Sequence, residues 1–200
     1  MTEVDATPVR TGEEQRWLLL IYRIKAESSG HRTYAWRQLR QLGAVYLQQA
    51  AAVLPDRPEL RVGLDRLGQR IRSAGGEASL LETVSPSRAW EEELVARFNA
   101  ARDAEYEEIV DSVERFEDEI RREARRKRFR FAELEEGETD WEKLQRWFAR
   151  LTVRDFFGAP GRAGAEAALA RGRTLLDGFT QEVYRLEGLG PGTIGGRTGR

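Results

Sequence analysis

After Pro86 the apolar residues of this chain recur every three or four positions over a long stretch. This spacing matches the turn of an α-helix and predicts one amphipathic helix over residues 89–127. The apolar positions, with a gap near Tyr106, are Leu94, Phe98, Ala101, Ile109, Val113, Phe116 and Ile120. Because a lone helix cannot bury so long an apolar stripe, we expect it to pack against further helices or a second chain.

Two shorter helices are predicted after the long one. The first carries Trp141, Leu144, Trp147, Phe148 and Leu151, and the second carries Ala168, Leu169, Leu175, Leu176, Phe179, Val183 and Tyr184. Residues 155–160 predict a structured turn between them. A helical domain over residues 88–187 follows, and the glycine-rich residues 188–200 are expected to form a flexible tail.

The chain before Pro86 has a different texture, with short apolar runs separated by Gly, Ser and Pro. Strands are predicted at 17–24, 44–47, 51–54 and 78–84, the first of them buried on both faces. Two helices are predicted between the strands, the first ended by Gly43 and the second by Gly75-Gly76. The apolar residues of the first helix are Tyr34, Trp36, Leu39 and Leu42. The order strand, helix, strand, strand, helix, strand over residues 14–86 is that of a ferredoxin-like domain. The expected fold class is therefore α+β, with residues 1–13 disordered.

Composition excludes several kinds of site. The chain has no cysteine and one histidine, His31, so disulfides, thiolate chemistry and any site that needs two histidines are excluded. A net charge of −1 means that contact with a nucleic acid requires local basic patches. The apolar run at 17–21 is too short to cross a bilayer and lacks the flanks of a signal peptide, so the expected location is cytoplasmic.

The densest positive charge lies at the expected end of the long helix. It consists of Arg121, Arg122, Arg125, Arg126, Lys127, Arg128 and Arg130. One interpretation is a solvated helix end, neutralised by the acidic residues 133–142. The other is a DNA-binding patch beside Phe129 and Phe131, because the helix dipole acts over one turn only and does not explain so many arginines.

A second basic group surrounds the start of the first predicted helix. Its members are Ser28, Ser29, His31, Arg32, Arg37 and Arg40. Free N–H groups at a helix N-terminus bind anions, so this group is a candidate contact for a phosphate or a small oxyanion. The alternative is a capped surface helix with ordinary charges.

No catalytic constellation is evident in the sequence. Glu105 with Glu108, and Asp111 with Glu114, lie one helical turn apart and have the spacing of shared metal ligands. Acidic residues on an exposed helix pair with arginines far more often, and di-iron bundles need Glu-x-x-His motifs that this chain cannot supply. We therefore expect no enzymatic activity, no metal and no cofactor.

Several blocks of sequence, in one order, resemble the N-terminal domain of the ChrB family of chromate-resistance regulators. The blocks are residues 17–24, 31–47, 52–55, 97–106, 131–135 and 154–159. The resemblance covers residues 14–187 and implies a transcriptional regulator of chromate-efflux operons. Full ChrB proteins carry a C-terminal domain that is missing here, so we expect oxyanion sensing to be lost or supplied by a separate polypeptide.

The first domain also resembles the ferredoxin-like domain of PaaX-type repressors and of CRISPR-adaptation nucleases. Those nucleases place an aspartate late in the first strand. This chain has Tyr22, Arg23, Ile24 and Lys25 there, so a Mg²⁺ site is not expected. No standard helix-turn-helix is evident either.

Two functions from different classes remain open. The first is a DNA-associated transcriptional regulator of a chromate or metal-oxyanion resistance system, acting as a homodimer through a sheet edge or the long helix. The second is a protein–protein interaction module that does not bind DNA and acts with a separate sensor protein of the ChrB C-terminal type. Neither involves a membrane.

Overall fold

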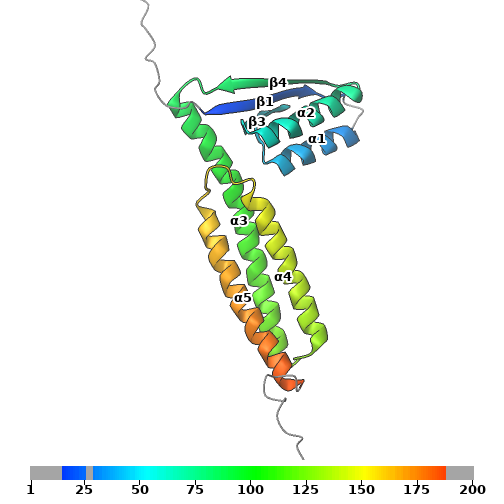
Figure 1. Ribbon diagram of the computed structural model, residues 1–200, viewed down its shortest axis with the longest axis vertical. Helices are drawn as coiled ribbons and strands as arrows, with labels where there is room; N and C mark the ends of the chain where they lie inside the picture. The colour runs from blue at the N-terminus through cyan, green and yellow to red at the C-terminus, as the bar shows by residue number, and fades with distance from the viewer. Residues whose placement is uncertain (1–14, 26–28, 188–200) are drawn as a thin grey trace, which may run out of the picture. The chain divides into compact units, whose positions relative to one another are not determined.

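The computed structural model describes residues 15–25 and 29–187, so the two expected tails lie outside the described residues. The described fold is α+β and mostly helical, with a four-stranded antiparallel sheet and five helices (Figure 1). The chain divides into two compact units, Met1–Phe98 and Asn99–Arg200, which we call the sheet unit and the helical unit. The division falls inside a helix, later than the expected boundary near residue 87.

The sheet unit is built from four strands and two helices. The strands are β1 (Arg16–Arg23), β2 (Val45–Gln48), β3 (Ala51–Pro55) and β4 (Glu77–Val84). They lie in the order β2-β3-β1-β4, and every neighbouring pair is antiparallel. Helices α1 (Ser29–Leu42) and α2 (Pro58–Ser73) lie on one side of this sheet (Figure 1).

Strand β1 is buried on both faces near its start, as its apolar run predicts, whereas Ile21 is 45% exposed. Trp17 and Leu18 point to opposite faces of the sheet, and both are 0% exposed. Leu18 lies opposite Leu54 of β3 in the register. On the other face, the Trp17 ring stacks on Phe98 at 5.8 Å, and its indole N–H donates to Ser85.

Both predicted helix stops are confirmed. Gly43 and Gly75 have positive φ angles of 82° and 75°, which glycine adopts without strain. The N–H of the following residue then reaches back to the carbonyl five positions earlier, from Ala44 to Leu39 at 2.9 Å and from Gly76 to Ile71 at 3.0 Å. These are the hydrogen bonds of a Schellman C-cap.

The face that α1 buries differs from the predicted one. Tyr34 and Trp36 were assigned to the core, but they are 41% and 47% exposed. Ala35 and Leu39 are fully buried instead. A sequence pattern favours large aromatic side chains as core residues. Here the small Ala35 faces the interior instead, which allows α1 to pack closely against the rest of the sheet unit.

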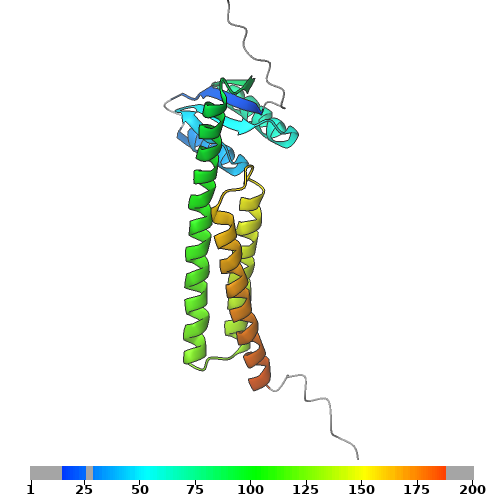
Figure 2. The ribbon, with the colours of Figure 1, turned by 90° about the vertical axis from the view of Figure 1, so that its left-hand side faces the viewer.

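The helical unit is a three-helix bundle. Its helices are α3 (Arg88–Arg125), which begins in the sheet unit, α4 (Phe131–Thr152) and α5 (Gly161–Leu186). They run side by side in both views (Figures 1 and 2). Within this unit the stripe of α3 is buried by the other two helices, and its core members are Tyr106, Ile109, Val113, Phe116, Ile120, Trp141, Leu144, Leu151, Leu176, Phe179 and Val183.

Helices α4 and α5 begin earlier than their apolar residues predict. Helix α4 starts at Phe131, so much of the acidic stretch 133–142 is its first half, with Leu134 and Gly137 buried among the acidic side chains. Glu133, in the first turn, is also favoured by the helix dipole. Helix α5 starts at Gly161 and buries Ala165 ahead of the predicted apolar positions.

Candidate functional site

Helix α1 directs arginines to solvent. Because Ala35 and Leu39 face the interior, Arg37 and Arg40 lie on the exposed side of the helix. The guanidinium of Arg40 lies over the exposed ring of Trp36, 5.4 Å from its centroid. This is a cation–π contact, which holds the guanidinium in place on the exposed side of the helix.

A second contact of the same kind links α1 to α2. The guanidinium of Arg70 lies over the ring of Tyr34, 5.5 Å from its centroid, and both residues are exposed. Helix α1 contains no Asp or Glu. We call the set of Tyr34, Trp36, Arg37, Arg40 and Arg70 the arginine–aromatic surface. Sequence reasoning missed Arg70, although the absence of acidic residues from the whole of α1 was visible in the sequence.

The other members of the predicted anion group lie at the start of α1. Ser29 and His31 are in its first turn and are exposed. Arg32 donates from Nη1 to the carbonyl of Lys25 at 3.1 Å. Ser28 lies outside the described residues.

The basic cluster at the end of α3 is largely paired with carboxylates. Arg121 contacts Glu117 at 2.7 Å, and Arg122 contacts Glu119 at 2.8 Å. Arg126 and Arg128 lie 3.5 and 3.6 Å from the oxygens of one carboxylate, Glu123. The ion pairs described for the cluster therefore involve carboxylates of α3 itself, whereas one interpretation of the sequence assigned this role to residues 133–142.

Three cations of this cluster have no carboxylate partner among the described residues: Arg125, Lys127 and Arg130. Lys127 has a positive φ of 54°, and the N–H of Arg128 bonds to the carbonyl of Glu123 at 3.0 Å. A lysine thus takes the position that glycine occupies in the other two Schellman caps. The cluster presents fewer available charges than its sequence indicates.

A buried ionic network joins α3 to the segment after α4. One carboxylate oxygen of Glu105 lies 2.6 Å from the guanidinium of Arg102, and the other lies 2.8 Å from the guanidinium of Arg154. The three side chains are 6 to 15% exposed. This network fills the gap in the apolar stripe near Tyr106, and no sequence period could have revealed it because its partners are far apart in the chain.

Asp155 continues this network through the turn between α4 and α5. It accepts a hydrogen bond from the Tyr106 hydroxyl at 3.1 Å and from the N–H groups of Gly158 and Ala159. Burial and the bond to Asp155 raise the pKa of Tyr106 above its usual range, so it stays a donor. Asp103 accepts the N–H of Gly161 at 2.7 Å and so caps α5. These contacts serve to fix the turn.

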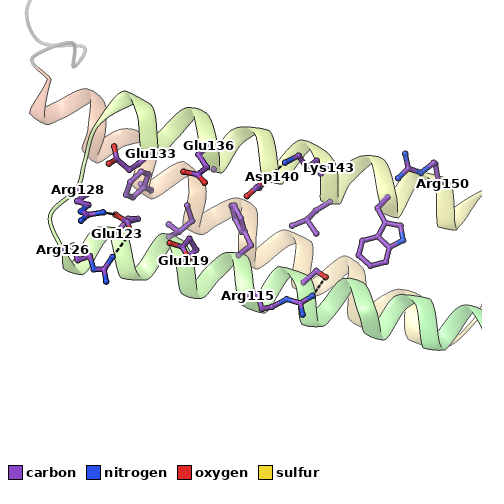
Figure 3. Close-up of a pocket in the computed structure, with 17 residues that line it drawn as sticks. Arg115, Glu119, Glu123, Arg126, Arg128, Glu133, Glu136, Asp140, Lys143 and Arg150 are labelled. Carbon is purple, nitrogen blue, oxygen red and sulfur yellow. Dashed lines mark hydrogen bonds and ion pairs between the residues drawn. The ribbon is translucent and has the colours of Figure 1, made fainter.

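A groove of about 820 Å³ runs between α3 and α4. Its floor is apolar and includes Phe116, Ile120, Leu144, Trp147 and Phe179. Figure 3 shows charged side chains from both helices along it. Most of the carboxylates lie toward the α3–α4 turn, together with Arg126 and Arg128, while Arg115, Lys143 and Arg150 lie toward the other end.

Neither a metal site nor a membrane span is found in the described parts of the chain. No group of three or more acidic or histidine side chains there is arranged to hold a metal ion. None of the described helices combines the length and the apolar character needed to cross a bilayer.

Comparison with known proteins identifies the family. The family described as "Protein ChrB, N-terminal" matches residues 32–189, most of the chain. The chain belongs to the ChrB N-terminal family. Protein ChrB of Cupriavidus metallidurans is 34% identical over 95 residues, which is 48% of this chain and 29% of that protein. The aligned segment thus spans less than a third of the curated relative. No solved structure matches the chain.

The ChrB match begins inside α1, so β1 precedes it, and it extends through α5. Two of the blocks that carry the resemblance to ChrB, 97–106 and 154–159, meet in the network of Glu105, Arg154 and Asp155. The residues behind the family resemblance are therefore in part structural, and they hold the helical unit together.

Proposed function

We propose that this chain is a cytoplasmic, DNA-associated regulator of resistance to chromate or a related metal oxyanion. Membership of the ChrB N-terminal family supports the link to chromate resistance. We also propose that the sheet unit has a ferredoxin-like fold. The element order of β1, α1, β2, β3, α2 and β4, with β1 and β3 at the centre of the sheet, supports this assignment.

The arginine–aromatic surface is the observation that carries the DNA-binding proposal. A protein with a net charge of −1 is not drawn to DNA as a whole, so a local positive surface must provide the contacts. Helix α1 contributes Arg37 and Arg40 to this surface and contains no Asp or Glu. Exposed aromatic rings beneath guanidinium groups are also an arrangement suited to phosphates and bases.

A salt titration of DNA binding tests this proposal. Wild-type protein should bind double-stranded DNA with an affinity that falls as salt rises. Replacing Arg37, Arg40 and Arg70 with alanine removes up to three phosphate contacts and should lower the slope of log affinity against log salt by up to about 3 units. Absence of wild-type binding at low salt would overturn the function, and an unchanged slope in the variant would overturn its assignment to this surface.

The second candidate, a module that binds a separate sensor protein, is favoured by the pairing of the α3 cluster with carboxylates. A paired cluster suits a protein interface better than it suits DNA. Passing cellular extract over the immobilised chain, with and without nuclease treatment, distinguishes the two candidate functions. Retention of a protein partner after nuclease treatment, together with no DNA binding, supports the second candidate.

A further inference from the structure

Among the described residues, the groove charges that make no ion pair are separated by sign, whereas Arg126 and Arg128, at the same end as Glu133, are paired with Glu123. Glu133 and Glu136 lie near the turn that joins the helices, whereas Arg115 and Arg150 lie toward the opposite end (Figure 3). Glu133 and Arg150 are both on α4, and a rise of 1.5 Å per residue places them roughly 25 Å apart along the helix. The groove therefore has an acidic end and a basic end.

The charges at both ends are available for a partner. Among the described residues, Glu133, Glu136 and Arg150 make no ion pair, and Arg115 donates only to the hydroxyl of Ser112, at 2.8 Å. The other charges of the groove are paired locally, such as Lys143 with Asp140. The Oε2 atom of Glu133 is buried and receives no hydrogen bond, which is costly for a carboxylate oxygen.

We propose that this groove is the surface through which two copies of the chain pair around a twofold axis. In a twofold dimer the same patch meets itself in reverse, so a stable patch must complement its own inverted image. Here the inversion brings the acidic end of one copy, with Glu133 and Glu136, against the basic end of the other, with Arg115 and Arg150. A groove whose charges all had the same sign would repel the same groove of a second chain. DNA is also an unsuitable occupant, because the acidic end would repel its phosphates.

The apolar floor adds to the attraction. Trp147, which lines the groove, is only partly buried in the single chain, and a second copy seated over the groove covers more of its surface. Charge complementarity then fixes the register of the two copies. This inference does not depend on DNA binding.

Charge-reversal variants of the full chain test the proposal by light scattering over a dilution series. Wild-type protein should approach twice the 22.9 kDa chain mass. Glu133→Arg with Glu136→Arg makes both ends basic, and Arg115→Glu with Arg150→Glu makes both ends acidic. Each double variant should dimerise at least about tenfold more weakly, because like charges then face each other.

Mixing the two double variants supplies the decisive result. A basic-ended copy complements an acidic-ended copy at both contacts, so the mixture should form dimers that neither variant forms alone. The matched control is Glu135→Arg with Glu138→Arg, on the exposed side of α4 outside the groove, which should leave dimerisation unchanged. Circular dichroism verifies that each variant is folded. A monomeric wild type, a dimer insensitive to the groove variants, or a mixture that stays monomeric would each overturn the proposal.

Discussion

Gly172 determines how closely α4 and α5 approach each other. A Cβ atom at this position would lie 2.8 Å from the ring of Trp141 and 3.1 Å from Val113, both in the core. Gly172→Ala should therefore lower the free energy of unfolding by roughly 1–3 kcal/mol, the cost of overpacking a core, despite the better helix propensity of alanine. Urea denaturation measures this change.

Gly164 is the matched control for that substitution. It lies in the same helix, but nothing stands within 4 Å of a Cβ built there. Gly164→Ala should leave stability unchanged or raise it by up to about 1 kcal/mol, through helix propensity alone. If the two variants behaved alike, close packing at Trp141 would not be the reason for Gly172.

Glu105 holds two guanidinium groups in the interior of the helical unit. Glu105→Ala removes the carboxylate that Arg102 and Arg154 share, and breaking a buried pair in this way costs roughly 3–5 kcal/mol. The expected result is a large loss of thermal stability measured by calorimetry. Glu107→Ala, an exposed neighbour on the same helix, should change stability little, and an equal loss there would contradict the role assigned to the network.

At the scale of elements, the end of α3 and the face of α1 should contribute differently to DNA binding. Arg121, Arg122 and Arg126 already face carboxylates of α3, so replacing them with alanine should change the salt slope by less than about 1 unit. The corresponding triple variant of the arginine–aromatic surface should change it by up to about 3 units. Equal effects would show that the α3 ion pairs open on DNA.

Helix α4 begins just before an acidic stretch of the sequence. Residues 133–140 read as a polar segment, yet they form the first turns of α4 because Leu134 and Gly137 are buried there. An apolar residue every third or fourth position is enough to attach a charged helix to a core. Glu133, in the first turn, is in addition favoured by the positive end of the helix dipole.

At the scale of the whole molecule, we expect no nuclease activity. Strand β1 ends at Tyr22-Arg23, with Arg23 beside Glu77 of the neighbouring strand, and no group of acidic side chains in the described residues is arranged for a metal. Incubation with DNA and RNA in Mg²⁺ or Mn²⁺ should leave the substrates intact. Cleavage that is lost on replacing a carboxylate of the chain would contradict this expectation.

The local features of this protein were predictable from its sequence. Periodicity identified the strands and at least part of each helix, and glycine identified two helix ends, because these features depend on a few neighbouring residues and on backbone geometry. The candidate basic residues were found for the same reason, since charge is visible in the sequence.

Only the tertiary structure decided which side chains face solvent and which charges are neutralised. A helical period cannot tell whether Ala35 or Trp36 faces the core, because both lie near the boundary of the apolar face and the depth of packing selects between them. Nor can it show that Glu105 meets Arg154, a residue 49 positions away. Such pairs form only when the packing of helices brings distant residues together, and the sequence contains no local signal for that contact.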